Sequence, residues 1–416
     1  MNQKKQKIHY AWLILAACCM MQGAGLGLVS NCAGVFYSPV CQDLGFEMGK
    51  FSIYRMLFSI SSAFAMPFVA KSFRKMDIRV VISAATVVMG GCSIAMGTFT
   101  ELWQWYAAGI IQGLASSFIS MIPAPILLAN WFHKKTGFAI GISAAFSGLV
   151  GMLGSSGLGF SIPAIGWRAS YIMIGVLVMV LILPMSMFVI RYKPEDKNML
   201  AYGAEAGTAV KDSKKSETKE ALGTFLREPL FYISVFMYSC SCAGAYVNTY
   251  LTSCGISVGM SITTAAMLTT VALFGNMLSK FVLGKASDSF GTIRVFLAAT
   301  ALSLAGLLLL LTGKPQIMLP AAFFYGITMP LSTVMMPLFC KMFWKGDTYA
   351  AGYSYVSMFG MLISSPFTTI FGAFYDRTGS YNLTLETASA MLLSVMILVL
   401  VGARINKNME KASSRA

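Results

Sequence analysis

The sequence has few charged residues. Asp, Glu, Lys and Arg make up 11% of its 416 positions, whereas 56% are hydrophobic. A soluble domain carries about 25% charged residues. The hydrophobic residues form long continuous runs of about 20 positions, the length needed for a membrane-spanning helix. The composition therefore predicts an all-α membrane protein and excludes a transmembrane β-barrel, whose strands are short and alternate in polarity.

Twelve such runs are present, and the polar, charged segment 191–228 separates the first six from the last six. A segment of this composition is typical of a linker. We therefore predict a six-helix bundle at 1–190, a cytoplasmic linker at 191–228 and a second six-helix bundle at 229–416. The expected spans, numbered 1 to 12 in chain order, are Ala11–Phe36, Phe51–Ala70, Arg79–Thr98, Leu102–Ala129, Thr136–Ala164, Ala169–Ile190, Leu230–Thr252, Met260–Leu283, Ile293–Thr312, Gln316–Cys340, Tyr349–Ala373 and Thr387–Ala403.

Acidic residues are missing from the middle of these spans, because all 16 Asp and Glu lie in loops or near span ends. A carrier of cationic compounds needs buried acids to attract its substrate. The two charges inside the spans are both cations, Arg55 and Lys280. A charge at membrane depth is costly and usually functional, and a positive cavity favours an anion.

The net charge of +15 does not indicate a nucleic-acid partner. When the N-terminus is placed in the cytoplasm, 25 of the 31 Lys and Arg residues fall on the cytoplasmic side and four on the outer side. This asymmetry predicts a multi-pass protein of the cytoplasmic membrane with both termini in the cytoplasm. The lipid bilayer accounts for the basic excess.

The nine cysteines show no metal-ligand spacing, and no nucleophile–base set or phosphate-binding loop is evident. We therefore predict no enzyme activity, no cofactor and no metal. Cys41 and Cys254 lie in expected outer loops, and a disulfide between them is left open because its formation depends on their distance.

The two halves resemble each other in sequence. The stretch "WFHKKTGFAIG" at 131–141 aligns without gaps with "MFWKGDTYAAG" at 342–352, and both join the fourth and fifth spans of their half. Internal repeats of this kind are typical of transporters, whose substrate site lies near the midplane between the repeats.

With twelve spans and a central loop, the chain resembles the major facilitator superfamily. The loop signature of that family, Gly-x-x-x-Asp-x-x-Gly-x-x-Arg, is matched after span 8 by Gly284, Asp288, Gly291 and Arg294. The resemblance implies two pseudo-symmetric six-helix bundles and a gating role for this loop.

A second set of residues resembles the oxalate/formate antiporter and monocarboxylate porter branch of the superfamily. That branch carries Trp-Phe, basic residues, Gly-x-Ala-x-Gly and a later Gly-Trp-Arg. The matching residues are Trp131, Phe132, Lys134, Lys135, Gly137, Ala139, Gly141, Gly166, Trp167 and Arg168.

The branch has an Asn or Asp four residues before an Arg on span 8, and that Arg is implicated in binding the substrate carboxylate. The resemblance therefore implies that Lys280 anchors a carboxylate, with Asn276 beside it on the same helical face. Lys in place of Arg replaces a bidentate fork by a point charge. The second cation that oxalate exchangers carry on span 11 is absent here. For Lys280, extension to the cytoplasmic surface is the alternative.

Other polar side chains are candidates for the substrate site. Arg55 either takes part in substrate binding or gating, or extends outward and pairs with a loop acid such as Glu47. Each of the uncharged candidates also suits an interhelical hydrogen bond. They are Asn31, Gln112, Tyr246, Tyr250 and Tyr353.

These observations favour a secondary active transporter of a small organic anion, in particular a monocarboxylate. We expect alternating access as proton symport or anion exchange, with protons as a second partner, by a monomer. The alternative is an exporter of neutral or amphipathic compounds, which predicts that transport survives Lys280→Gln. A transporter-like sensor without flux is a third reading, and the short linker leaves little room for the signalling domain that it needs.

Overall fold

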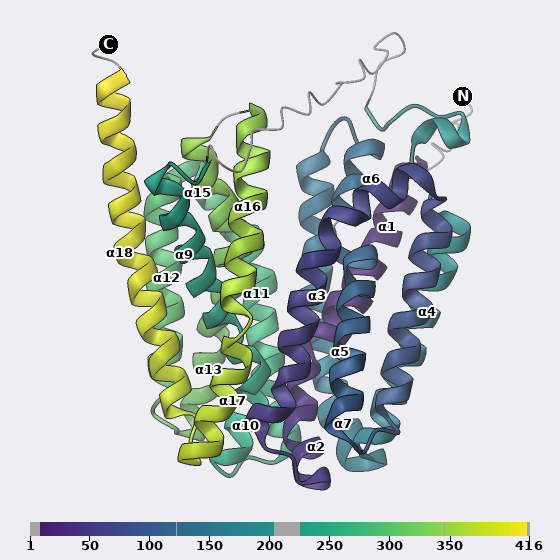
Figure 1. Ribbon diagram of the computed structural model, residues 1–416, viewed down its shortest axis with the longest axis vertical. Coiled ribbons are helices and arrows are strands. Elements are labelled where there is room, and N and C mark those ends of the chain that lie inside the picture. The colour runs from purple at the N-terminus through teal and green to yellow at the C-terminus, as the bar shows by residue number, and fades with distance from the viewer. Residues whose placement is uncertain (1–8, 122, 204–224, 345, 414–416) are drawn as a thin grey trace, which may run out of the picture.

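The computed structural model describes residues 9–121, 123–203, 225–344 and 346–413. They form two helical bundles side by side, the first half of the chain in one and the second half in the other (Figure 1). Helix α1 begins and α18 ends at the same end of the molecule, which we call the termini end, and the opposite end we call the far end. The even number of crossings expected from the sequence agrees with this placement.

The first bundle contains spans 1 to 6. Span 3 begins at the N-cap Asp77, whose carboxylate accepts a hydrogen bond from the backbone N–H of Arg79. The elements are α1 (Tyr10–Gln22), η1 (Gly23–Asn31), η2 (Ala33–Phe36), α2 (Tyr37–Leu44), α3 (Met48–Lys75), α4 (Ile78–Met96), α5 (Leu102–Ser116), η3 (Ser117–Met121), α6 (Pro123–Trp131), α7 (Thr136–Pro184) and η4 (Met185–Val189).

The second bundle contains spans 7 to 12 and follows the short 3₁₀ helix η5 (Pro194–Lys197). Its last helix extends to Ser413, ten residues beyond the predicted end of span 12. The elements are α9 (Pro229–Ala245), α10 (Val247–Ser257), α11 (Ile262–Phe290), α12 (Thr292–Leu310), α13 (Pro315–Tyr325), α14 (Thr328–Pro330), η6 (Leu331–Met335), α15 (Met336–Phe343), α16 (Gly346–Ser364), α17 (Phe367–Thr378) and α18 (Asn382–Ser413).

Ten stretches of the described residues are helical, long and apolar enough to cross a membrane. One of them, Thr136–Val189, has 54 residues, far more than the roughly 20 that a bilayer requires. The chain reverses inside it at Gly166, whose φ of 82° and ψ of 161° suit only glycine, so this stretch is two spans. Helix α3, with 28 residues and several cations, completes the twelve.

Spans 1, 4, 7 and 10, the first of each group of three, are not continuous α-helices. Spans 1, 4 and 10 contain π-helical turns at η1, η3 and η6, and span 7 is interrupted at Tyr246 between α9 and α10. Such turns free backbone groups and often occur at functional sites. Span 6 also contains the π-helical turn η4, and span 11 is interrupted between α16 and α17, so the breaks are not confined to the first span of each group of three.

Two of the motifs in the sequence have structural roles at bundle edges. Trp131 donates from its indole N–H to the carbonyl of Arg191 (2.8 Å) and so fixes the start of the linker. Trp167 donates to Asp43 (3.1 Å), and Arg168 donates to the carbonyl of Phe99 (3.3 Å). The Gly-Trp-Arg turn therefore ties the reversal of the chain in α7 to helix α2 and to the loop after α4.

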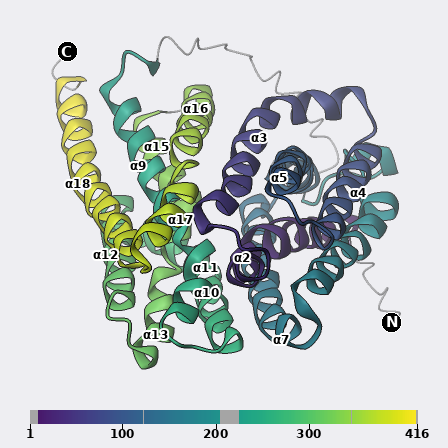
Figure 2. The ribbon, with the colours of Figure 1, turned by 60° about the horizontal axis from the view of Figure 1, so that its bottom comes forward.

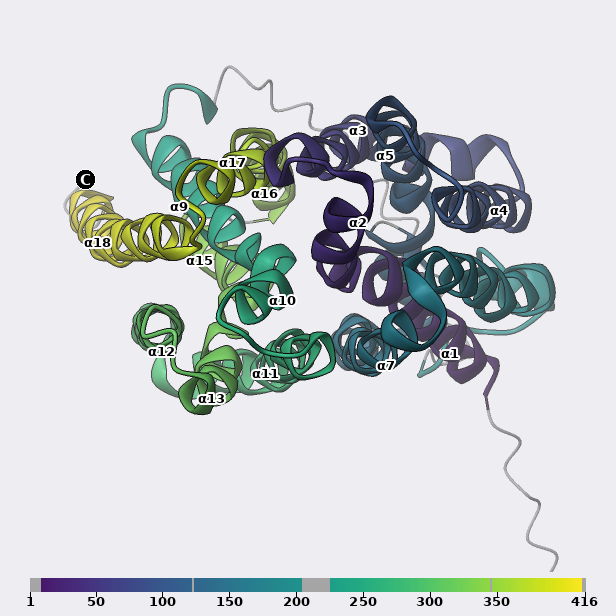
Figure 3. The same cartoon turned by 90° about the horizontal axis from the view of Figure 1, so that it is seen from below.

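The two bundles meet at three pairs of helices near the far end. Seen from below, α3 lies beside α17, α2 beside α10, and α7 beside α11 (Figure 3). The tilted view shows α2 and α17 coming forward together at this end (Figure 2). Cys41 in α2 and Cys254 in α10 are both free thiols, so the disulfide left open by the sequence is not formed in this structure.

Candidate functional site

Helices α7 and α11 form a tightly packed antiparallel contact between the bundles, which we call the α7–α11 seam. A Cβ on Gly148 would lie 3.0 Å from Met277 Cβ, and a Cβ on Gly159 would lie 2.8 Å from Ala266 Cβ. Ser155 donates to the carbonyl of Ala266 (3.0 Å). Small residues on α7 therefore let the two backbones approach closely, as in other membrane helix pairs.

The seam ends toward the termini end near Lys280. A Cβ added to Gly137 or Gly141 of α7, or to Gly284 of α11, would meet no atom within 4 Å. Lys280 of α11 still reaches across the seam, to the carbonyl of Ala144 of α7. Lys280 therefore lies at the boundary between the closed part of the interface and the part where the helices separate.

The ammonium group of Lys280 has few protein partners. Its Nζ lies 3.5 Å from the carbonyl oxygen of Ala144, at the outer limit of a hydrogen bond, and no carboxylate of the described residues lies within 4 Å. A lysine has three N–H donors, so this cation has unused capacity for an acceptor. The seam register places Ala144 level with Lys280, so the side chain reaches across to the other bundle.

Asn276 is buried one turn before Lys280, with 2% of its surface exposed. Its side-chain oxygen has no hydrogen-bond partner among the described residues. A buried polar atom without a partner costs free energy and needs an explanation. The backbone of Asn276 packs against span 10, since a Cβ on Gly326 would lie 3.0 Å from its N atom.

At the far end, Asp376 of α17 joins the second bundle to the first. Its carboxylate accepts hydrogen bonds from the backbone N–H groups of Met48 (2.8 Å) and Gly49 (2.6 Å) at the N-terminus of α3. The contact needs glycine, because a Cβ on Gly49 would lie 2.9 Å from the backbone N of Ala373. A carboxylate at a helix N-terminus is stabilised by the helix dipole. We call this contact the far-end latch.

Spans 1 and 7 also close the far end. Asn248 donates from its side chain to the backbone carbonyl of Asn31 (3.2 Å), and Asn31 donates to the carbonyl of Ser147 (3.3 Å). The ring of Tyr250 lies edge-on to that of Tyr37, and its hydroxyl donates to the carbonyl of Thr368. In this conformation Asn31 and Tyr250 serve contacts between helices.

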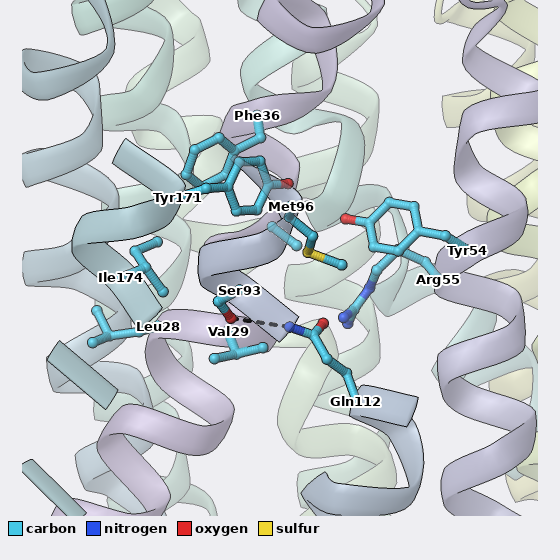
Figure 4. Close-up of a pocket in the computed structure, with 11 residues that line it drawn as sticks. Leu28, Val29, Phe36, Tyr54, Arg55, Ser93, Met96, Gln112, Tyr171 and Ile174 are labelled. Atoms are coloured by element: carbon cyan, nitrogen blue, oxygen red, sulfur yellow. Dashed lines mark hydrogen bonds between the residues drawn. The ribbon is translucent and has the colours of Figure 1, made fainter. Parts of the chain in front are cut away.

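Arg55 lies on α3 beside a small cavity of the first bundle (Figure 4). Its guanidinium is 4.3 Å from the ring centre of Phe58, and no carboxylate of the described residues lies within 4 Å. Glu47, the partner that the sequence left open, instead pairs with Lys50 (2.8 Å). The structure therefore shows a third setting for Arg55, beside an aromatic ring.

The Arg55 cavity also contains Gln112, which donates to Ser93 (3.0 Å). Its volume of about 20 Å³ holds about one water molecule and no organic anion. In Figure 4 the hydroxyl groups of Tyr54 and Tyr171 face each other above Gln112. Lys280 does not line this cavity, so the structure separates Arg55 and Gln112 from Lys280.

Two further candidates lie in the second bundle. Tyr353 on α16 stacks on Tyr349 at 6.2 Å and meets Tyr238 edge-on at 6.5 Å. Tyr246 lies at the break between α9 and α10, among Ser59 of α3 and two serines of span 11. Tyr246 therefore sits where the second bundle faces the first.

The loop signature after span 8 has a clear backbone role. Gly291 ends α11 and begins α12 with φ of 86°, a conformation that favours glycine. Asp288 and Arg294 are exposed. In the related loop after span 2, Asp77 caps α4, and the hydrogen bond from the Arg79 guanidinium holds the pKa of the Asp77 carboxyl below its usual value.

Sequence reasoning missed Asp376 and Gly34. Asp376 lies near a helix end and resembles any loop acid. A Cβ on Gly34 would lie 2.1 Å from the carbonyl oxygen of Thr249, so this glycine permits the contact of spans 1 and 7. No local pattern marks these two residues, because their partners lie more than 200 positions away.

Comparison with known proteins places this arrangement in a family. The Major Facilitator Superfamily model matches residues 13–340. The uncharacterized MFS-type transporter YhjX of Escherichia coli (strain K12) is 23% identical over 318 residues, which is 72% of this chain and 72% of that protein. Probable transporter MCH2 of Saccharomyces cerevisiae is 27% identical over 154 residues, 36% of this chain and 32% of that relative.

Solved structures of low sequence identity share the fold. The inward-facing, unoccupied structure of a bacterial homolog of the human lysosomal transporter Spinster has a TM-score of 0.66 at 13% identity and covers 96% of this chain and 97% of that one. The nucleoside transporter NupG has a TM-score of 0.72 at 10% identity and covers 95% and 99%. From its family match, the chain belongs to the Major Facilitator Superfamily and is a multi-pass membrane transporter, not an enzyme.

Proposed function

We propose that this transporter moves a small organic anion, a monocarboxylate, by alternating access, with Lys280 as the anchor of the carboxylate. The observation that carries the proposal is the position of Lys280 at the end of the α7–α11 seam. A substrate bound there contacts both bundles, since Lys280 belongs to the second and Ala144 to the first. Occupancy of that boundary can therefore influence whether the helices close or separate.

The unused donors of Lys280 support an anionic substrate. A cation in a low-dielectric site is costly unless an opposite charge or several acceptors surround it. The single long contact to Ala144 does not provide them. A carboxylate would accept hydrogen bonds from the ammonium group, and charge-assisted bonds of this kind are about twice as strong as neutral ones.

A site with a single cationic anchor favours a monocarboxylate over a dicarboxylate as the substrate. Arg55, the second cation within the spans, is beside Phe58 at a cavity too small for a substrate, so in this conformation it offers no second anchor. With no acid in the middle of the spans, we propose that a transported proton travels on the carboxyl group of the substrate, or that anion exchange replaces proton coupling.

The distribution of Lys and Arg supports a cytoplasmic location for the termini end. In that orientation the far-end latch and the three helix pairs close the outer side, and the separation beyond Lys280 faces the cytoplasm. We therefore propose that this conformation is the inward-facing one, in which the substrate exchanges with the cytoplasm.

The test is uptake into proteoliposomes of labelled monocarboxylates, dicarboxylates and neutral amphipathic compounds, by the wild type and by Lys280→Gln. Lys285→Gln is the matched control, because Lys285 is an exposed cation on the same helix. We expect uptake of at least one monocarboxylate by the wild type and by Lys285→Gln, and its loss in Lys280→Gln at equal protein level.

Two results would contradict the proposal. Equal uptake of the acid by the wild type and by Lys280→Gln would remove Lys280 from the site. Uptake of neutral amphipathic compounds but of no carboxylate would favour the exporter alternative.

A further inference from the structure

A long apolar groove lies on the outside of the second bundle, between α11 and α12. It has a volume of about 560 Å³ and is lined almost entirely by apolar side chains. We call it the α11–α12 groove. Its walls include Leu278 and Val282 of α11 and Ala298 and Leu302 of α12. Three of these, Leu278, Val282 and Leu302, are more than 40% exposed, as expected for side chains that face lipid.

The groove is closed toward the far end by α13. A Cβ on Gly275 of α11 would lie 2.3 Å from the carbonyl oxygen of Phe323, and a Cβ on Gly306 of α12 would lie 2.4 Å from the N atom of Tyr325. Both helices therefore press against α13 there. Phe323, Phe324 and Ile327 line the groove at this closed end. Toward the termini end the described residues that line it belong to α11 and α12 alone.

The charged lining residue is Arg294, at the start of α12 on the termini end. Arg294 is exposed, and no carboxylate of the described residues lies within 4 Å of it. The groove thus combines a deep apolar slot at membrane depth with a free guanidinium at its mouth. A guanidinium binds phosphate through two parallel hydrogen bonds.

We propose that the α11–α12 groove binds an anionic phospholipid, with one acyl chain in the slot and the phosphate against Arg294. Charge complementarity selects this occupant. An apolar helix or a lipid without phosphate would leave the guanidinium without a partner, and a zwitterionic lipid places a cationic choline or amine beside the phosphate, which weakens its attraction to the guanidinium. Basic pockets between membrane helices bind anionic head groups in this way.

The groove is separate from the proposed carboxylate site. Lys280 contacts α7 through the seam, whereas Leu278 and Val282 face away from the first bundle on the groove side of α11. A lipid wedged between α11 and α12 would touch the helix that carries Lys280 without entering the interface between the bundles. Lipid binding in the α11–α12 groove can therefore be tested independently of which substrate binds at Lys280.

Lipid retention by the purified transporter tests the proposal. The wild-type protein is mixed with equal amounts of phosphatidylglycerol and phosphatidylcholine in detergent, and bound lipid is counted by native mass spectrometry. Ala298→Trp fills the groove, and Ala301→Trp is its matched control, an exposed alanine on the same helix that does not line the groove. Arg294→Gln removes the charge, with Lys285→Gln as control.

We expect the wild type to retain phosphatidylglycerol at least fivefold over phosphatidylcholine. Ala298→Trp should lose most of the bound lipid, and Arg294→Gln should lose the preference but keep some lipid of both kinds. Ala286→Leu, which fills the groove from the α11 side, replaces Ala298→Trp if that variant misfolds. Equal retention of both lipids by the wild type, or unchanged retention by the filled variants, would overturn the proposal.

Discussion

Lys280 and Arg55 are the two cations within the predicted spans, and the structure gives them different surroundings. Arg55 is beside a small cavity of one bundle, next to the Phe58 ring. Lys280 reaches from one bundle to the other at the end of the α7–α11 seam, where it makes one long hydrogen bond among the described residues, to the carbonyl of Ala144. Both charges stand out equally in the sequence, but only one lies where the two bundles begin to separate.

The difference teaches that charge at membrane depth is not sufficient to identify a substrate anchor. The position of the charge relative to the moving parts decides what binding can do. A ligand at Arg55 would touch helices of one bundle only, whereas a ligand at Lys280 touches both. Only differential contact with two conformations lets a ligand shift their equilibrium.

The largest expected effect is on substrate affinity, and it compares the two cations directly. Loss of a hydrogen bond to a charged group costs about 1.5–3 kcal/mol, so Lys280→Gln should weaken binding of the transported acid about tenfold to a hundredfold. Arg55→Gln should change it less than threefold. Isothermal titration of the purified variants measures both affinities. A larger loss in Arg55→Gln than in Lys280→Gln would reverse the comparison.

A second prediction concerns the α7–α11 seam, whose closed part ends at Lys280. Gly148→Leu overpacks the closed part, where the added Cβ already lies 3.0 Å from Met277, whereas Gly141→Leu enters open space. Overpacking costs about 1–3 kcal/mol, so Gly148→Leu should depopulate the closed far end about fivefold to a hundredfold.

Pulsed electron paramagnetic resonance between spin labels at Thr100 and Lys314 measures this population, since both positions are exposed at the far end in different bundles. Gly148→Leu should add a longer distance, and Gly141→Leu should leave the distribution unchanged. Equal effects of the two substitutions would mean that the seam does not end where the structure places it.

The third prediction weakens the far-end latch without adding bulk. In Asp376→Asn one carboxylate oxygen becomes an amide nitrogen, which cannot accept the hydrogen bond from the α3 N-terminus. A carboxylate in this position is worth about 0.3–2 kcal/mol, so the same spin labels should show an increase of the open far end of up to about thirtyfold. Glu47→Gln, which breaks only an exposed pair with Lys50, is the control. An unchanged distribution in Asp376→Asn would show that the latch does not hold the bundles together.

The twelve spans were predictable because hydrophobic runs and the positive-inside rule report directly on the bilayer. The family match and the structure confirm the helical membrane fold. The interruptions of spans 1, 4, 7, 10 and 11 and the π-helical turn of span 6 were not predicted, since such breaks arise from packing and carry no strong local signal. The reversal at Gly166 was foreseen only as a gap between two runs.

The candidate site was predictable in part. Lys280 stands out from the sequence because a lysine in an apolar run has few explanations. Asp376 does not stand out, because its function depends on the N–H groups of Met48 and Gly49, more than 300 positions earlier in the chain. Conversely, Tyr250 was a reasonable candidate for substrate contact, and its bond to Thr368 becomes visible only when spans 7 and 11 are packed together. Local patterns identify unusual residues, but their partners come from tertiary structure.

The smallest expected effect is on stability, and it asks whether the cation enclosed in the first bundle stabilises the fold. A cation over an aromatic ring contributes about 0.5–1 kcal/mol at partly exposed sites. If the contact of Arg55 with Phe58 stabilises the bundle, Arg55→Met and Phe58→Leu should each lower the apparent melting temperature in detergent, and the double variant should lose less than the sum. A higher melting temperature in Arg55→Met would instead mean that desolvation of the guanidinium costs more free energy than its contact with the Phe58 ring contributes. Arg55 would then destabilise this conformation and serve a function in another conformation of the transport cycle. The difference between Arg55 and Lys280 would in that case apply only to the conformation described here.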